Sequence, residues 1–539
     1  MATTTSQSRG AMRDRVRLND GNRRWWTLAA MCFALFMIML DNTVVNVALP
    51  SIQKDLEASL PGLEWTLNAY TLTFAVLLVT GGRLGDIYGR RRMFLFGVAV
   101  FSLSSAAIGL APGQAWLVAG RAIQGIGAAF MMPATLSIIT DAFPAEERGR
   151  AIGTWAGVSA LALAIGPVLG GALTEYVSWR AIFFLNLPVA VGAVAVTLFA
   201  THESRDQTAE RRVDLPGMVA LSLGLTALVL ALVEGNQWGW RSLAIVGLLG
   251  AALAGLAAFT ALEPRVRAPV VDFSFFRSRT FFGANLTGFI VAFAMLAVFF
   301  FLALYMQNIL GYSPVQAGVR FLPTTLMVII TAPIAGRLAD RIGPRPLMTA
   351  GLGLVAIALF LLTRVDVDTG YALLLPPFIV MGLGIGLTMA PMSTAAMNSV
   401  SAGKAGVASG ILSMTRMVGA TFGIAALGAL FQHLASTRLR ETLAGTGLTN
   451  AQRDQIVHHL GSARGSAGAG LDPQLAAHVG RAARDAFIHA LSGGMWLSTG
   501  VAAAGAVAAW LLVERRPTMR DVSAQPRSGA SARPVSSGS

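Results

Sequence analysis

Long apolar runs separated by short polar segments make up most of this chain. Many of the runs exceed the roughly 18 apolar residues that a helix needs to cross a bilayer. The pattern therefore predicts an all-α polytopic membrane protein with fourteen transmembrane helices. The expected spans are 25–49, 65–82, 93–111, 115–140, 150–174, 181–200, 214–233, 242–262, 280–307, 315–336, 347–363, 371–400, 406–432 and 486–512.

The composition supports a membrane protein and argues against a soluble enzyme. Hydrophobic residues make up 54% of the 539 residues and charged residues 13%, whereas a soluble domain carries about 25% charged residues. The net charge of +14 would suit a nucleic-acid partner, but the arginines lie in short loops between spans, so we expect none. No Cys/His cluster suggests a metal, and we expect no cofactor. The single cysteine, Cys32, excludes an intramolecular disulfide.

The distribution of Lys and Arg predicts the orientation of the chain. With the N-terminus in the cytoplasm, the tails and short cytoplasmic loops hold 28 of the 41 Lys and Arg residues, and the short external loops hold four. Positive residues accumulate on the cytoplasmic side of membrane proteins, so we expect both termini in the cytoplasm and the chain in the cell membrane. The long loop 433–485 would be external, as a connector, a lid or a docking site, with short surface helices at 434–444 and 474–488.

A short charged hairpin occurs twice and indicates two related halves. The first copy is Gly82–Arg92, and the second, Gly336–Arg345, begins 254 residues later; both read G-R-L-small-D-x-x-G-x-R and both join two apolar runs. Such internal symmetry is typical of transporters. The expected domains are a cytoplasmic tail (1–24), an N-terminal six-helix bundle (25–200), two inserted helices (214–262), a C-terminal six-helix bundle (280–512) and a disordered cytoplasmic tail (513–539).

The hairpin resembles the loop between the second and third spans of the major facilitator superfamily. Its glycines allow two helices to pack closely, and Arg90 lies one helical turn after Asp86, where the two can pair. The resemblance implies a two-bundle carrier with a gating latch that closes the cytoplasmic side in the outward-facing state. The latch residues would be Gly82, Asp86, Gly89, Arg90 and Asp141, with Asp340 in the second copy, where Pro344 replaces the arginine. The alternative is a loop that only fixes the topology.

Two further motifs place opposite charges inside the first half. Leu40–Pro50 resembles the span-1 signature of the fourteen-span drug:proton antiporters, the EmrB/QacA-like branch, and Arg121–Ala129 resembles the superfamily's R-x-x-Q-G-x-G-A motif, which is associated with proton coupling. A carboxylate inside an apolar helix is costly unless it is paired, protonated or hydrated. Asp41 and Arg121 lie at similar depths, both about 10 Å from the outer ends of their spans. We therefore expect a pair in which Asp41 exchanges protons and Arg121 tunes it; two helix-end side chains that reach for the membrane interface are the alternative.

Polar residues near these charges are the candidate substrate contacts. Asn42, Asn46 and Gln124 belong to the two charged motifs, and Arg416 lies within a Gly-rich stretch of the thirteenth span. An arginine inside the membrane is most often functional, although pairing with a polar neighbour for structure is an equal alternative for Arg416.

The fifth span carries a motif that predicts the direction of transport. Its residues Gly166, Pro167, Gly170 and Gly171 resemble the antiporter motif G-x-x-x-G-P-x-x-G-G, with Ala162 in place of the first glycine. A Gly-Pro pair permits a kink in the helix. The resemblance associates the motif with export, and Trp179–Pro188, which opens the sixth span, matches the same branch.

Together these motifs predict a proton-driven antiporter that exports amphipathic drugs or antibiotics, and no enzyme. Only two lysines occur, Lys54 and Lys404, and neither completes a P-loop for an ATP-driven pump. The expected partners are a small amphipathic substrate, protons and the lipid bilayer, and we expect a monomer. The alternatives are an exporter of an endogenous lipid, peptide or metabolite, and a membrane sensor or scaffold that transports nothing. The scarcity of carboxylates within the spans favours substrates other than divalent cations.

Overall fold

A computed structural model describes residues 20–58, 60–207, 214–266, 269–367, 369–443 and 473–515. Within these ranges the chain is helical, and 14 helices are long and apolar enough to cross a membrane. The prediction of an all-α, fourteen-span protein is therefore confirmed. Most of the two expected tails, and the middle of the 433–485 loop, lie outside the described residues.

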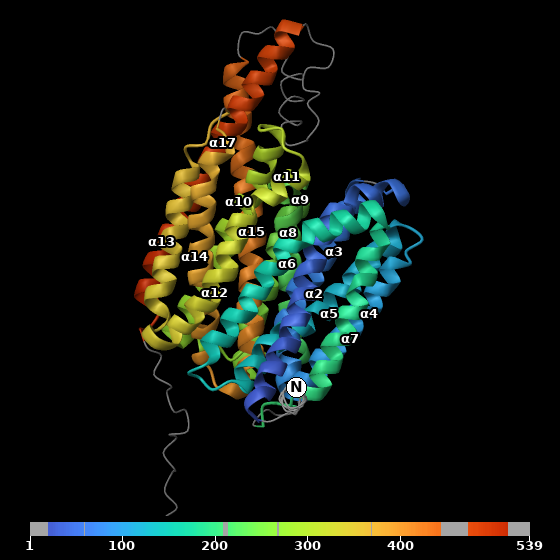
Figure 1. Cartoon of the computed structure of the whole chain (residues 1–539), viewed down its shortest axis with the longest axis vertical. Helices are drawn as coiled ribbons and strands as arrows, with labels where there is room; N and C mark the ends of the chain where they lie inside the picture. Colours follow the sequence, from blue (N-terminus) through green and yellow to red (C-terminus); the bar gives the residue numbers. More distant parts are fainter. Residues whose placement is uncertain are drawn as a thin grey trace, which may run out of the picture.

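The N-terminal half is a bundle of six long helices (Figure 1). Apolar side chains surround most of each helix, as is typical of helices buried in a bundle or in a membrane. Close packing joins α3 and α4 to α5, and α2 to α6 and α7. The helices are α2 (Asp20–Asp55), α3 (Leu60–Tyr88), α4 (Arg90–Gly109), α5 (Gln114–Ala142), α6 (Arg148–Tyr176) and α7 (Trp179–Ala200).

The two helices between the halves, α8 (Leu215–Trp238) and α9 (Leu243–Leu262), pack against each other. Asp214 begins α8 by accepting a hydrogen bond from the amide of Gly217, and Ser242 caps α9 in the same way through Ile245. From this pair, α8 contacts α3 of the first half and α15 of the second. The inserted helices therefore cover one of the two seams between the halves. Two short 3-10 helices follow, η1 (Glu263–Arg265) and η2 (Phe273–Arg277).

The C-terminal half repeats the six-helix plan with one interruption. The expected span 315–336 consists of two helices, α11 and α12, which meet at Phe321; Pro323 follows at the start of α12, where its missing N–H costs no hydrogen bond. The helices are α10 (Arg279–Asn308), α11 (Pro314–Arg320), α12 (Leu322–Ile342), α13 (Pro344–Leu362), α14 (Tyr371–Asn398), η3 (Ala402–Lys404), α15 (Ala405–Thr442) and α17 (Pro473–Leu512). One core of buried apolar side chains extends through both halves and includes Leu35, Phe101, Phe281 and Phe378.

The two helical stretches expected within the 433–485 loop are helical but are not separate surface helices. They continue α15 to Thr442 and begin α17 at Pro473, and α17 projects beyond the rest of the bundle in Figure 1. A small apolar cluster that includes Leu439 and Val479 joins them, and Arg438 pairs with Asp485 at 2.8 Å. The continuity arises because apolar residues at helical spacing extend past the span, so the helices have no reason to end at the membrane boundary.

The halves touch most closely at the end of the bundle where α2 begins and α17 ends, which we call the N-terminal face. A Cβ atom added to Gly149 would collide with the backbone of Gly336 across the seam between α6 and α12. One turn further along α6, a Cβ on Gly153 would lie 2.6 Å from the carbonyl oxygen of Ala332, and on Gly157 the closest approach is 3.5 Å. The two helices therefore separate with distance from the N-terminal face, and that face is closed.

Candidate proton-coupling centre and gating latches

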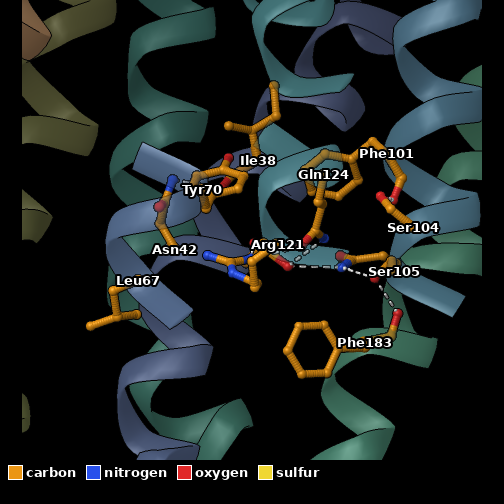
Figure 2. Close-up of polar contacts among 12 residues, drawn as sticks. Ile38, Asn42, Leu67, Tyr70, Phe101, Ser104, Ser105, Arg121, Gln124 and Phe183 are labelled. Atoms are coloured by element: carbon orange, nitrogen blue, oxygen red, sulfur yellow. Dashed lines mark hydrogen bonds and ion pairs between the residues drawn. The ribbon is translucent and has the colours of Figure 1, made fainter. Parts of the chain in front are cut away.

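A buried ion pair lies within the N-terminal half, where α2 faces α5 (Figure 2). Arg121 donates through Nη1 to Oδ2 of Asp41 at 2.5 Å, and both side chains are 1% exposed or less. Arg121 Nε also donates to the carbonyl oxygen of Thr66 at 3.1 Å, and the guanidinium lies 4.2 Å from the ring centroid of Tyr70. The structure thus places the two predicted charges together, with the cation also held by α3.

Amide side chains complete the ligation of the Asp41 carboxylate. Gln124 Nε2 donates to Oδ1 at 3.0 Å while its Oε1 accepts from Arg121 at 2.7 Å. Asn186 on α7 also donates to Oδ1 at 3.1 Å, and it donates to the Ser105 hydroxyl on α4 at 3.0 Å. Five helices therefore position one carboxylate, in a buried setting where each such bond is strong.

Asn186 and Ser105 were not among the residues that sequence reasoning assigned to this centre. Asn186 lies in the Trp179–Pro188 motif that opens α7, and a polar residue within an otherwise apolar span was the available signal. Ser105 gave no such signal, because serine in a transmembrane helix commonly bonds to its own backbone; here its hydroxyl donates to the carbonyl oxygen of Phe183 at 2.8 Å.

The four candidate substrate contacts lie on three helices, α2, α5 and α15. Gln124 belongs to the ion-pair centre. Asn42 and Asn46 lie on α2 but donate to backbone carbonyls one turn earlier in their own helix, at 3.1 and 2.8 Å, and stay partly or fully exposed. Arg416 lies on α15 in the other half. Three of the predicted contacts therefore lie in the first half and one in the second, and their common role stays a prediction.

The first latch joins the two halves at the N-terminal face. The Asp86 carboxylate accepts hydrogen bonds from the amides of Gly406 and Val407, at 3.0 and 2.9 Å, and these amides begin α15. Arg90 donates to the same carboxylate at 2.8–2.9 Å and to the carbonyl oxygens of Ala402 and Gly403 at 2.5 and 2.8 Å. A carboxylate at the positive end of a helix dipole is favourable, and this one binds α3 to the opposite half.

Asp141 contributes to the first latch only weakly. Its carboxylate lies 3.9 Å from Nη1 of Arg90, and its side chain is 43% exposed. A stronger contact next to the latch was not predicted: Lys404, which precedes α15, donates to Asp272 at 2.6 Å. Burial would raise the pKa of the Asp272 carboxyl, but the hydrogen bonds from Lys404 and Ser274 outweigh burial and lower it. The Asp272 carboxyl is therefore charged at neutral pH.

The second copy makes the mirror-image contact although it lacks the arginine. The Asp340 carboxylate, on α12, accepts from the amides of Gly149 and Arg150 at 3.0 and 3.2 Å, and these amides begin α6 in the first half. Pro344 removes the ion pair but leaves this contact intact, since the partners are backbone groups. Each half thus supplies one carboxylate to a helix start of the other half.

Each latch hairpin turns at a glycine with positive φ. Gly89 has φ +114° and Gly343 has φ +87°, a backbone conformation that residues with a Cβ atom rarely adopt. At Gly89 a Cβ would also collide with the carboxylate of Glu203. The conformational demand of the turn therefore explains the glycine that both copies share.

The glycines of the export-associated motif line the contact between α6 and α2. A Cβ on Gly166 would collide with Thr43, and a Cβ on Gly170 would lie 2.8 Å from Val44 Cγ1, whereas at Gly171 the nearest atom is 3.9 Å away. Gly166 and Gly170 therefore allow α6 to pack beside the helix that carries Asp41. Pro167 lies between them, inside a single continuous helix.

An apolar cavity of about 360 Å³ lies where the inserted helices meet both halves. Its lining comes from α3, α8, α9, η2, α10 and α15 and contains no charged side chain; it includes Val79, Leu225, Phe259, Phe276, Phe289 and Met414. Sequence reasoning did not identify this cavity, because its walls look like ordinary lipid-facing helix surface in a linear sequence.

We expect Gly82→Ala to hinder closure of the N-terminal face and to lower transport about fivefold or more, since overpacking of this kind costs about 1–3 kcal/mol. The added methyl would collide with the carbonyl oxygen of Gly406, which is backbone and has no rotamer to change. Gly85→Ala is the matched control on the same helix, because its Cβ would meet only the Cα of Arg90, at 4.0 Å. The measurement is transport per inserted molecule; equal activity of the two variants would contradict the packing argument.

Comparison with known proteins gives the family. A profile of the Major Facilitator Superfamily matches residues 31–424. The chain is 38% identical over 408 residues to the tetracenomycin C resistance and export protein of Streptomyces glaucescens, with 76% of each chain covered. It is 39% identical over 418 residues to the multidrug resistance protein Stp of Mycobacterium tuberculosis, covering 77% of this chain and 78% of that one. It is also 39% identical to the puromycin resistance protein pur8 of Streptomyces alboniger, over 75% and 81% of the two chains.

A solved structure supports the fold independently of close sequence similarity. The crystal structure of the human organic anion transporter MFSD10 (TETRAN) superposes with a TM-score of 0.59 at 14% identity, covering 89% of this chain and 99% of that chain. The predicted family and fold are confirmed. The chain belongs to the major facilitator superfamily of membrane transporters, among its drug and antibiotic efflux proteins.

Proposed function

We propose that this efflux transporter is a proton-driven antiporter that carries amphipathic drugs or antibiotics out of the cell by alternating access. The observation that carries the proposal is the buried Asp41 carboxylate, which is paired with Arg121 and bonded by Gln124 and Asn186. Relatives of the chain are named for resistance to, or export of, tetracenomycin C and puromycin, which supports an antibiotic as the substrate.

The ion pair suits proton exchange because its two partners lie on different helices. While Arg121 and Asp41 touch, the cation stabilises the charged carboxylate; once α2 and α5 separate, an isolated carboxylate in an apolar site is unstable and takes up a proton. A substrate that displaces this proton from Asp41 would then be exported in exchange for it. Asp41 is the exchanging group and Arg121 the group that sets when exchange occurs.

The two latch contacts would control the change between the states that open to either side of the membrane. The excess of arginine near the N-terminal face supports a cytoplasmic location for that face and for both termini. The protein itself would lie in the cell membrane. The state described here is then closed to the cytoplasm by Asp86, with Arg90 and Asp141, and by Asp340. Rocking of the halves would break both contacts, and the Gly166–Gly171 segment of α6, with Pro167, would absorb part of the motion. The transporter would work as a monomer, without a metal or cofactor.

The test is drug-evoked proton release from respiring everted vesicles. Wild type should respond to at least one compound in a panel of antibiotics and dyes, and Asp41→Asn should reduce that response at least about tenfold, because the amide keeps the shape but binds no proton. Asp55→Asn is the matched control on the same helix, since Asp55 is half-exposed and pairs with Arg180.

Two outcomes would contradict the proposal. A proton release from Asp41→Asn equal to that of wild type would show that a group other than Asp41 carries the protons. A wild type that is folded and inserted yet exports drugs without proton movement would exclude antiport. If metabolites but no drugs evoke proton release, the exporter of an endogenous compound is the correct reading.

A further inference from the structure

The middle of α15 carries Arg416, a cation for which the described residues provide no partner. Arg416 lies eleven residues after Ala405, the first residue of the helix at the N-terminal face, which places it roughly 16 Å along the helix axis. In the part of the chain that the structure describes, no carboxylate and no hydrogen-bond acceptor pairs with its guanidinium. The side chain is partly exposed and not sealed in the core.

The stem of Arg416 lies near apolar atoms of three helices. It passes Gly288 on α10: a Cβ added to Gly288 would lie 3.1 Å from Arg416 Cγ, 3.2 Å from Met392 Sδ on α14 and 3.5 Å from Leu412 Cδ1. Because glycine has no Cβ atom, Gly288 leaves room for the Arg416 stem. Three helices of the second half bound this space without offering it a negative charge.

Other arginines at comparable positions are neutralised or stacked. Arg121 pairs with Asp41 and Arg90 with Asp86. Arg320 lies 3.6 Å from the ring centroid of Tyr312 and donates to the carbonyl oxygen of Gln316. Among the residues that the structure describes, Arg416 therefore has neither the ionic nor the stacking partner that these three arginines have.

A partly exposed cation for which the described residues provide no partner can bind a negatively charged group that arrives from outside. Arginine binds carboxylate, sulfonate or phosphate oxygens through two parallel hydrogen bonds. The Asp41–Arg121 pair is neutral as a unit and leaves the positive charge of Arg416 uncompensated. This charge favours an anion and disfavours a cation.

We propose that Arg416 is the recognition group for the acidic function of an amphipathic organic anion, so that the transporter selects anionic over neutral and cationic amphiphiles. The proposal rests on the proposed export function and names the substrate class for it. The guanidinium would take the acidic group, from the exposed side of Arg416.

The test compares two fluorescent probes that differ by one sulfonate: 1-anilinonaphthalene-8-sulfonate and N-phenyl-1-naphthylamine. Energy transfer from tryptophan reports their binding to purified full-length protein. Arg416→Gln should weaken binding of the sulfonate at least about tenfold, the loss of one hydrogen-bonded charge pair, and should leave the neutral amine unchanged. Arg416→Lys should keep part of the preference. Arg320→Gln, which removes a different arginine of the same half, should change neither affinity.

The proposal would be overturned if Arg416→Gln weakened binding of both probes equally or of neither. A purely structural role of Arg416 would not distinguish the sulfonate from the neutral amine. Anionic lipid offers the same chemistry, so binding is repeated in phosphatidylcholine nanodiscs with and without phosphatidylglycerol. The sulfonate preference should persist in phosphatidylcholine alone; an effect of Arg416→Gln confined to membranes with phosphatidylglycerol would assign the arginine to a lipid headgroup instead.

Failure of the export function would be distinguishable. If no compound evokes proton release in everted vesicles, antiport is wrong, whatever the probes show. If cationic compounds evoke proton release and the sulfonate neither competes with them nor binds through Arg416, antiport stands and the anionic substrate class is wrong.

Discussion

Asp86→Ala is expected to open the N-terminal face and to reduce export about a hundredfold. The carboxylate neutralises Arg90, and it accepts the first two amide hydrogen bonds of α15. Removing one partner of a buried ion pair costs about 3–5 kcal/mol, and each 1.4 kcal/mol is about tenfold in population. The state closed at the N-terminal face would therefore lose its advantage over the open state, and the transporter could no longer face outward for release.

A cysteine on the part of α15 that packs against α3 measures this directly. Ser409 is fully buried, and it precedes Gly410, where an added Cβ would lie 2.7 Å from the carbonyl oxygen of Leu78. In a Cys32→Ser background, Ser409→Cys should react slowly with a maleimide from the N-terminal face, and adding Asp86→Ala should accelerate the reaction. Asp141→Asn is the graded control: its pair with Arg90 is long and exposed, so the effect should stay within about fivefold. Unchanged labelling in Asp86→Ala would contradict the role of the latch.

The sequence was sufficient for those features that depend on side chains of unusual type at a recognisable depth. The fourteen spans follow from apolar runs, and the meeting of Asp41 with Arg121 follows from two charges at equal depth in a medium that does not tolerate them singly. Neither inference needs the tertiary packing to be known, because the bilayer fixes how far each residue lies along the membrane normal.

Features that depend on backbone groups were not predictable in this way. The loss of the arginine at Pro344 suggested that the second copy of the hairpin is weakened, yet Asp340 still binds the amides that begin α6. Every residue except proline has a backbone amide, so the sequence does not indicate which amides will bind a carboxylate. The common role of Asn42, Asn46, Gln124 and Arg416 as substrate contacts stays a prediction, because rotation of each helix about its axis decides which face a polar residue occupies.

Arg121→Met is expected to abolish proton exchange while leaving the protein in the membrane. Without the guanidinium, the Asp41 carboxylate would have only the amides of Gln124 and Asn186, which do not offset the cost of a buried charge. We expect the carboxyl group to remain protonated throughout the cycle, so that it never releases the proton that drives export. Drug-evoked proton release from everted vesicles should fall at least about a hundredfold, the scale of a lost proton-transfer group.

The double variant Asp41→Asn with Arg121→Met separates charge balance from function. Each single variant leaves one buried group without its counterpart, and the double variant leaves none, so the effects on stability should not add. Thermal unfolding in detergent should show the double variant to be more stable than Arg121→Met alone, while proton release stays absent in both. Proton exchange that survives in Arg121→Met would show that Asp41 charges and discharges without its arginine, and the ion pair would then be a structural contact only.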